Sequence, residues 1–189
     1  MTVTEAFEKW AGFELYKAAG SQDAMEAEAR RLGLDPPPGL SVQGLYDLIF
    51  IHAVEPKINL ARPVVLMDYP AFVPCLAKKS ADGNTMERWE LYARGIELTN
   101  CFTEETRPEE VRRFFESEKE IKEKSALVNH SVDDDYWKIF KEKGKGNAVA
   151  EGKREKVLNC SGVAMGLDRL IMLLCGRSTI DGILPFPFE

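Results

Sequence analysis

Residues 160–174 read Cys-Ser-Gly-Val-Ala-Met-Gly-Leu-Asp-Arg-Leu-Ile-Met-Leu-Leu, and this stretch decides the fold expected for the chain. Small residues at Gly162, Ala164 and Gly166 alternate with larger apolar ones, as in an extended strand with one bare face. The apolar run after Asp168 contains no Gly or Pro and is typical of a buried helix packed behind a sheet.

Arg169 would lie in the first turn of that helix. There its guanidinium and the free backbone amides of the helix start favour an anion such as phosphate. The alternative is a glycine-containing core strand that leads into a helix, with Arg169 in a structural ion pair.

A second informative stretch, residues 87–102, reads Glu-Arg-Trp-Glu-Leu-Tyr-Ala-Arg-Gly-Ile-Glu-Leu-Thr-Asn-Cys-Phe and predicts a β-hairpin that turns at residues 94–95. With that turn, Tyr92 pairs with Glu97 and Leu91 pairs with Leu98. Period-two alternation then puts Glu90, Tyr92 and Glu97 on one face.

Two neighbouring carboxylates on one sheet face repel each other, so a compensating cation is expected beside Glu90 and Glu97. Mg²⁺ carried by a nucleotide usually takes one or two carboxylates together with phosphate oxygens. The alternative is that both carboxylates point into water from the exposed face of an antiparallel sheet.

The rest of the chain predicts helices before and after one further strand. Helices are expected over residues 4–16 with Thr4 as the cap, over residues 21–32, after Ser41 and after residue 107, and a central strand is expected over residues 63–67. Residues 141–156 are rich in Lys and Gly and are interpreted as a mobile loop. A phosphate-contacting loop is the alternative.

The composition is that of one globular domain and excludes several classes of protein. A net charge of −6 over 189 residues argues against a protein that coats nucleic acid. The four cysteines form no Cys-x-x-Cys pair, which indicates reduced thiols and a cytoplasmic protein. Two histidines are too few for a metal cluster or for extensive histidine-based catalysis. No signal peptide or membrane span is expected, since the apolar stretches are short and interrupted.

Together, the two stretches resemble the second half of a class II aminoacyl-tRNA synthetase catalytic domain of the lysyl type. Residues 160–169 resemble the third signature motif of the tRNA-independent branch, whose members attach a lysine-like residue to a lysine of elongation factor P. Residues 88–104 resemble the metal- and lysine-binding segment of the same family.

This resemblance implies a partial α+β fold, a class II synthetase-like antiparallel β-sheet flanked by helices. A single domain over residues 1–189 would comprise a helical segment, 1–60, and a sheet with the third motif, 61–189. It would correspond to the C-terminal half of the catalytic core, with the first two signature motifs missing.

The resemblance also implies roles for individual residues. Glu90 and Glu97 would bind Mg²⁺ and the phosphates of ATP, and Arg169 would meet ATP as a catalytic residue. Glu104 would take the ε-ammonium of lysine, and Asn100 would contact its α-amino or carboxylate end. The floor of the pocket would be formed by Gly162, Ala164 and Gly166. Strict alternation does not place Glu104 on the face of Glu97, so a strand end or bulge is expected between them.

The chain also departs from the family pattern. Family members have Gly at the position of Cys101, where a thiol is expected to crowd the lysine backbone. The second motif of the family supplies an arginine that holds the α-phosphate of ATP, and the loss of one such donor typically costs about 10²–10³ in rate. The chain alone is therefore expected to form no aminoacyl-adenylate and to leave one sheet edge unpaired.

The function expected is ATP-dependent activation of lysine or a lysine analogue such as β-lysine, for transfer to tRNA or elongation factor P. A second copy, as in a homodimer, or a separate polypeptide with the N-terminal half would complete the site. Two alternatives remain open: a non-catalytic module that binds ATP or lysine or has a regulatory role, and an inert gene fragment. The absence of a visible anticodon-binding domain weakens tRNA as the acceptor.

Overall fold

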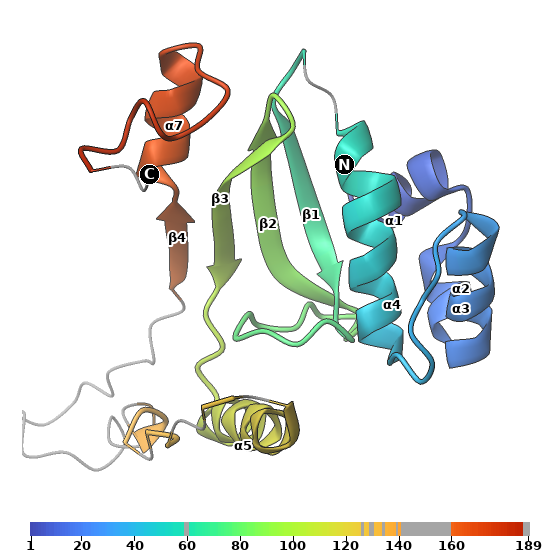
Figure 1. Cartoon of the computed structure of the whole chain (residues 1–189). Helices are drawn as coiled ribbons and strands as arrows, with labels where there is room; N and C mark the ends of the chain where they lie inside the picture. The colour runs from blue at the N-terminus through green and yellow to red at the C-terminus, as the bar shows by residue number, and fades with distance from the viewer. Residues whose placement is uncertain are drawn as a thin grey trace, which may run out of the picture.

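A four-stranded antiparallel sheet forms the centre of the computed structural model (Figure 1). Its strands, β1 (Val64–Pro70), β2 (Thr85–Ala93), β3 (Ile96–Thr103) and β4 (Ser161–Met165), lie side by side in chain order. The structure describes residues 1–58, 61–125, 127–128, 131–133, 135–138, 140 and 160–186. The expected loop of residues 141–156 lies outside these residues. The sheet and its flanking helices confirm the α+β class.

Short helical segments precede the sheet and lie beside β1 in Figure 1. They are α1 (Val3–Ala6), the π-helix η1 (Phe7–Ala11), α2 (Leu15–Ala19), α3 (Gln22–Arg31), α4 (Val42–Ile49), the π-helix η2 (Phe50–Val54) and the 3₁₀ turn η3 (Glu55–Lys57). The single helix expected over residues 4–16 is wrong, because Gly12 adopts a φ of 78° and ends the first unit. The cap is Thr2 rather than Thr4, and its side chain accepts a hydrogen bond from the amide of Glu5.

The hydrophobic core lies between these helices and strands β1 and β2. Phe7 stacks on Tyr46 with the ring centroids 5.2 Å apart, and both rings are buried. The sheet contributes Leu66, Tyr69 and Tyr92 to this core, all from β1 and β2. The helical layer therefore covers the β1–β2 half of one sheet face.

Strand β1 is the first strand of the sheet and not a central one, so the expectation for residues 63–67 is wrong in position. The N-terminal residues run along its outer side, where Thr2 forms a parallel bridge with Met67. The amide of Met67 also donates to the carbonyl of Met1 at 3.1 Å. The first residues of the chain thus pair with the outer edge of β1.

The hairpin between β2 and β3 turns as predicted, but its register contains an irregularity. Arg94 and Gly95 have φ angles of 51° and 74°, the two left-handed conformations of a type I′ turn. Tyr92 pairs with Glu97 as predicted, whereas Leu91 pairs with Thr99 and not with Leu98. One extra residue of β3 is therefore inserted at Leu98, which is a β-bulge.

The strand and helix predicted from residues 160–174 are confirmed as β4 and α7 (Leu167–Leu174), and Arg169 lies in the first turn of α7. The expected burial of this helix is wrong. Leu167 is 63% exposed and Leu174 is 78% exposed. Figure 1 shows the reason: β4 is the last strand of the sheet, and α7 follows it at the edge away from the helical layer.

The helix predicted after residue 107 is confirmed as α5 (Pro108–Ser125), which lies at the other end of the sheet from α7 (Figure 1). Its Val111 is buried, and most of its charged side chains face solvent. In the described ranges, no helix combines the length and apolarity that a membrane span needs. The four cysteines of the chain are free thiols.

Candidate functional site

The predicted site residues from three strands lie on one face of the sheet. Asn100 of β3 pairs with Glu90 on one side and with Ala164 on the other. Because side chains at paired positions of an antiparallel sheet point to the same face, the carboxylates of the hairpin share this face with the small residues of β4. Glu97 joins them through its pairing with Tyr92. The expectation of a carboxylate-bearing hairpin beside a bare strand is confirmed.

Glu90 lies at the centre of a buried cluster. Its Oε2 accepts hydrogen bonds from the hydroxyls of Tyr69 and, at 2.8 Å, Tyr92. Its Oε1 accepts a charge-assisted hydrogen bond from the guanidinium of Arg88, which also lies 4.5 Å above the ring of Tyr69. Burial and then the charge of Glu90 raise the pKa of both tyrosine hydroxyls, which therefore remain protonated donors.

Glu97 and Arg169 form the more open part of the site. The Nη1 atom of Arg169 donates to the backbone carbonyl of Glu97 at 3.0 Å and lies 4.0 Å from Oε2 of its carboxylate. Burial and then the neighbouring charge of Glu90 raise the pKa of the Glu97 carboxyl, and Arg169 offsets part of this rise. Both side chains remain partly exposed, so both are available to a ligand.

Glu55 is a further carboxylate that feels the charges of the site, and the sequence did not reveal it. It belongs to η3, directly before the sheet, and burial followed by the charge of Glu90 raises the pKa of its carboxyl, with Arg169 acting in the opposite direction. The charges of Glu90 and Arg169 thus act on Glu55, which comes from the helical segment before the sheet. Since its sequence context, Val-Glu-Pro-Lys, contains no metal- or phosphate-binding pattern, only the packing of the helices on the sheet identifies it.

Glu104 follows the end of β3 and lies over Gly162 of β4. A Cβ atom on Gly162 would approach Oε1 of Glu104 to 3.1 Å, so a side chain there would crowd this carboxylate. The β-bulge at Leu98 meets the expectation of a strand end or bulge between Glu97 and Glu104. Among the described residues, the Glu104 carboxylate has no hydrogen-bond or ion-pair partner, and it is half-buried.

Asn100 lies between Glu90 and Ala164, and its Oδ1 atom is buried without a hydrogen-bond partner in the described part of the chain. The Nε atom of Arg88 is likewise without a partner there. Buried polar atoms of this kind are costly unless a ligand, water or another group satisfies them. Together with Glu104, these atoms of β2 and β3 make this part of the face the candidate binding surface.

Two corrections concern individual residues. Cys101 pairs with Trp89 and Val163, one position along from Asn100, so its side chain lies on the opposite face of the sheet. The expectation that its thiol crowds the lysine site is therefore wrong. Gly166 does more than line the floor of the expected pocket. A Cβ atom at this position would lie 3.3 Å from Cδ of Arg169. A glycine at this position leaves room for the arginine to fold back over the sheet.

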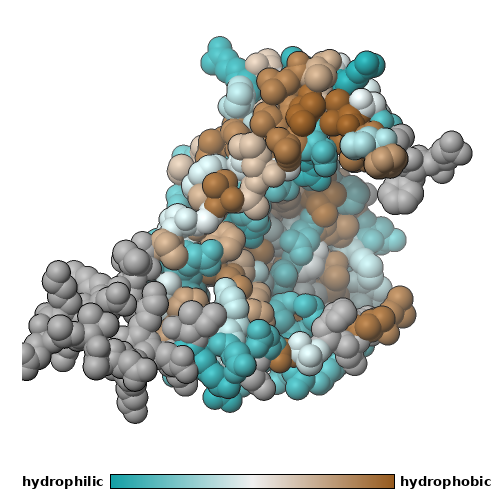
Figure 2. Space-filling view, turned by 90° about the vertical axis from the view of Figure 1, so that its left-hand side faces the viewer, coloured by the Kyte–Doolittle hydropathy of each residue, from teal (hydrophilic) through white to brown (hydrophobic). Residues whose placement is uncertain are grey.

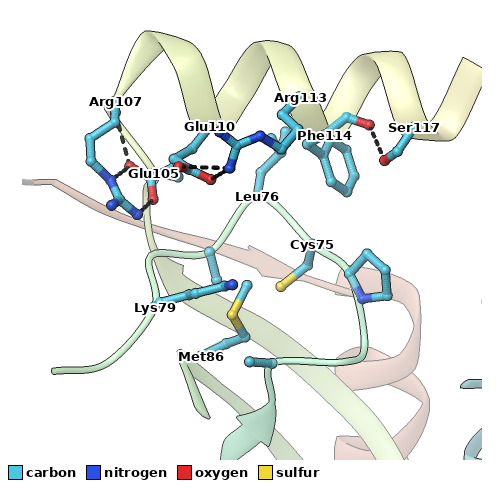
Figure 3. A pocket seen from close by; sticks show the side chains of 13 residues that line it. Cys75, Leu76, Lys79, Met86, Glu105, Arg107, Glu110, Arg113, Phe114 and Ser117 are labelled. Carbon is cyan, nitrogen blue, oxygen red and sulfur yellow. Dashed lines mark hydrogen bonds and ion pairs between the residues drawn. The ribbon is translucent and has the colours of Figure 1, made fainter. Parts of the chain in front are cut away.

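A cavity of about 290 Å³ lies away from the Glu97–Arg169 pair, between residues 71–79 and α5 (Figure 3). Its charged side chains largely neutralise one another. Arg107 donates to Glu105 at 2.5 Å and 2.9 Å, and Arg113 donates to both oxygens of Glu110. Because these pairs satisfy their own charges, we place the candidate site on the sheet face and not in this cavity.

The residues on the sheet face fit Mg²⁺ bound to nucleotide phosphates better than a metal centre made by protein alone. In the described segments, no group of three or more His, Cys, Asp or Glu residues could hold a metal ion. The oxygens of Glu90 already accept three hydrogen bonds, whereas Glu97 has one ionic neighbour. One carboxylate with a nearby arginine is a donor set that suits a metal–phosphate group.

Comparison with known proteins identifies relatives over most of the chain. The sequence profile of the family described as "tRNA synthetases class II (D, K and N)" matches residues 2–189. A protein of Avibacterium paragallinarum, named "Elongation factor P--(R)-beta-lysine ligase", is 32% identical over 190 residues, which cover 100% of this chain and 54% of the relative.

Proteins of the same name from two further bacteria also match. That of Vibrio cholerae serotype O1 is 37% identical over 145 residues, covering 76% of this chain and 41% of the relative. That of Proteus mirabilis is 35% identical over 144 residues, covering 76% and 40%. The chain thus spans about half the length, or less, of the curated relatives it matches.

Substitution of Glu90 by Gln is expected to destabilise the chain, because it leaves the partly buried Arg88 without its counter-charge. Removal of one partner of such a pair typically costs about 3 kcal/mol or more. Urea unfolding followed by circular dichroism would measure the loss. The double variant Glu90→Gln/Arg88→Met should recover part of it, and a loss below about 1 kcal/mol in the single variant would contradict the buried pair.

Substitution of Glu97 by Gln is expected to stabilise the chain at pH 7.5 and to lose that advantage as the pH falls. The raised pKa of Glu97 means that folding favours its protonated form, so the wild-type chain gains stability relative to the variant as the pH drops through that pKa. Thermal unfolding between pH 4 and pH 8 would test this. Glu116→Gln, which removes an exposed α5 carboxylate paired with Arg112, is the matched control. An equal effect of both substitutions at every pH would refute the assignment.

Proposed function

The chain belongs to the family of class II tRNA synthetases of the D, K and N type, and on that premise we propose that it takes part in ATP-dependent activation of lysine or a lysine analogue. The chain corresponds in this proposal to the C-terminal half of the catalytic core, with residues 1–60 as its helical segment and residues 61–189 as its sheet with the third motif. The other half of the site comes from a further polypeptide region or from a second copy of the chain.

The carboxylate of Glu104, which has no partner among the described residues, is the observation that carries this proposal. A half-buried carboxylate above a glycine is suited to a cationic ligand group, since a charged partner restores what burial removes. Lysine and β-lysine both carry such an ammonium group at the end of a slender chain. The Oδ1 atom of Asn100, which has no hydrogen-bond partner in the described structure and lies on β3 before Glu104, would accept from an amino group at the other end of the ligand.

ATP and Mg²⁺ would occupy the part of the same face nearer the hairpin turn. Mg²⁺ there would neutralise phosphate charge, and Glu97 would hold it, with Glu90 as the second carboxylate if one of its donors is released. Arg169 would contact the phosphates from the first turn of α7, where the free amides of the helix start favour an anion. Through the hydrogen bonds that it accepts, Glu90 positions Arg88, Tyr69 and Tyr92 beneath the region proposed for the phosphates.

The acceptor in this proposal is a protein lysine of the kind found in elongation factor P rather than tRNA. The matched relatives are named as elongation factor P--(R)-beta-lysine ligases. Lysine and (R)-β-lysine differ in the position of one amino group, so the same Glu104 contact serves either substrate. Discrimination between them would then depend on the Asn100 end of the site.

A non-catalytic ATP- or lysine-binding module is the second candidate function. The small number of guanidinium groups available at the site favours it for the chain acting alone. In the described part of the sheet face, Arg88 is engaged by Glu90, which leaves Arg169 as the guanidinium available to phosphates. One arginine suffices for binding, whereas formation of an adenylate needs charge stabilisation at the reacting phosphate as well.

Calorimetric titration of lysine and (R)-β-lysine, each with and without ATP·Mg²⁺, tests the lysine pocket. Glu104→Gln is expected to weaken amino-acid binding about tenfold or more, because an ion-paired hydrogen bond is replaced by a neutral one. Glu116→Gln on α5 changes the same chemical group at an exposed position and is expected to leave the affinity unchanged. Equal affinity in the wild-type and Glu104→Gln chains would remove Glu104 from the pocket.

ATP–pyrophosphate exchange tests catalysis by the 189-residue chain on its own. We expect no exchange above background with lysine or (R)-β-lysine, since one missing transition-state donor alone typically lowers the rate by about 10²–10³. Robust exchange by the purified chain would show that its own residues complete the reaction site. Binding without exchange would instead match the second candidate function.

A further inference from the structure

The cavity of about 290 Å³ between residues 71–79 and α5 is separate from the candidate site, and we call it the α5 cavity. Its walls come from the segment between β1 and β2, the start of β2, the residues after β3, and α5. Ligand pockets of proteins typically have volumes of about 300–1,000 Å³. The α5 cavity lies at the lower end of this range, so it suits a molecule of roughly ten non-hydrogen atoms.

The interior of the α5 cavity is apolar and includes an aromatic ring and a thioether. Figure 3 shows Phe114 and Leu76 on the side of α5 and Met86 on the side of the sheet. A second aromatic ring packs favourably against the first, edge to face or offset, and also against a methionine sulfur. The body of a ligand held between Phe114 and Met86 is therefore expected to be aromatic.

The rim of the α5 cavity is polar and leaves one positive charge without a partner. On the face shown in Figure 2, hydrophilic side chains predominate at the level of α5, whereas apolar side chains gather at the level of α7. At the rim, Glu105 accepts from Arg107 at 2.9 Å, and Glu110 accepts from Arg113 at 3.0 Å. Lys79 also lines the cavity, and it has no carboxylate partner among the described residues. An anionic group on the ligand would balance this charge.

We propose that the α5 cavity is a second ligand site, which binds a small aromatic carboxylate. The aromatic ring lies between Phe114 and Met86, and the carboxylate meets the ammonium of Lys79 at the rim. The volume limits the ligand to one ring with a short acidic side chain, as in 3-phenylpropionate. The inference does not depend on the proposed function, because none of these three residues belongs to the candidate site on the sheet face.

Hydrogen bonds join the wall of the cavity to the end of β3. The amide of Lys78 donates to the carbonyl of Thr103 at 2.8 Å, and the amide of Glu105 donates to the carbonyl of Leu76 at 2.9 Å. A ligand that packs on Leu76 restrains this pairing and makes its local opening rarer. Hydrogen exchange of the Lys78 and Glu105 amides therefore reports whether the cavity is occupied.

Titration of the chain with 3-phenylpropionate and with its neutral amide, 3-phenylpropanamide, is the first test. We expect the acid to bind with a Kd of about 1 mM or below, as suits a ligand of this size. The acid should bind about three- to fivefold more tightly than the amide, since an ion pair with the exposed Lys79 contributes modestly. Nuclear magnetic resonance measures both affinities under the same conditions.

Three variants test the residues of the site. Lys79→Met removes the ammonium and keeps a chain of similar length, so it is expected to bind acid and amide equally. Lys122→Met, the same change on α5 outside the cavity, should keep the preference for the acid. Ser117→Phe puts a ring into the cavity from an exposed position of α5 and is expected to weaken both ligands about tenfold or more.

The thiol of Cys75 tests whether the ligand occupies this cavity. It is half-buried and lines the cavity, whereas Cys160 and Cys175 are exposed elsewhere on the chain. With 3-phenylpropionate at about ten times its Kd, about 90% of the sites are filled, so alkylation of Cys75 by iodoacetamide should slow about fivefold or more. Peptide mapping by mass spectrometry should show unchanged alkylation of Cys160 and Cys175. Exchange of the Lys78 and Glu105 amides should slow in the same samples.

Four results would overturn the proposal. They are the absence of binding at about 10 mM acid when circular dichroism shows a folded chain, equal affinity of the wild-type chain for acid and amide, a preference for the acid that survives Lys79→Met, and binding that leaves the alkylation of Cys75 unchanged. None of these measurements involves lysine or ATP. The proposed function and the second ligand site therefore fail in different experiments.

Discussion

The register of β3 against β2 shifts by one residue at Leu98, and the arrangement of the site depends on that shift. Before it, Glu97 faces Tyr92; beyond it, Asn100 faces Glu90 and Ala164. Because side chains alternate along a strand, a ladder without the extra residue would turn Asn100 and Glu104 to the other face. The type I′ turn fixes one end of this register, and the pairing with β4 fixes the other.

The carboxylates of this face all belong to glutamate residues, but their electrostatic surroundings differ. Glu90 is buried and surrounded by donors from Arg88 and two tyrosines, so it acts as a structural acceptor. Glu97 and Glu55 are partly buried near the same charge, and their protons are held more tightly as a result. Glu104 is outside this cluster and without a partner in the described structure. One face of the sheet thus combines the buried cluster around Glu90 with the regions that we propose for a phosphate group and for a cationic group.

The sequence predicts the local elements of the site well because each has a local signal. Arg94-Gly95 is a turn pair, and the alternation of Gly162 and Ala164 with larger residues is a strand pattern. The bulge was expected only because Glu97 and Glu104 had to lie on the same face. Nothing in the residues around Leu98 predicts its position. The burial of α7, the opposite face of Cys101 and the approach of Glu55 depend on which elements pack together, so no window of sequence contains them. The roles proposed for Glu104 and Arg169 come from the family resemblance, because alternation alone does not assign them.

Within the described residues no strand pairs with the outer edge of β4, and this open edge has a consequence for the chain in a cell. A short, uncharged strand with open backbone groups accepts extended segments from many unfolded proteins, so a free population of this chain would be exposed to coaggregation. Chaperones that hold apolar segments, and proteases that cut strands from an open edge, would then determine how long an unassembled molecule persists. The abundance of the chain would thus follow the supply of whatever seals that edge, as in orphan-subunit quality control.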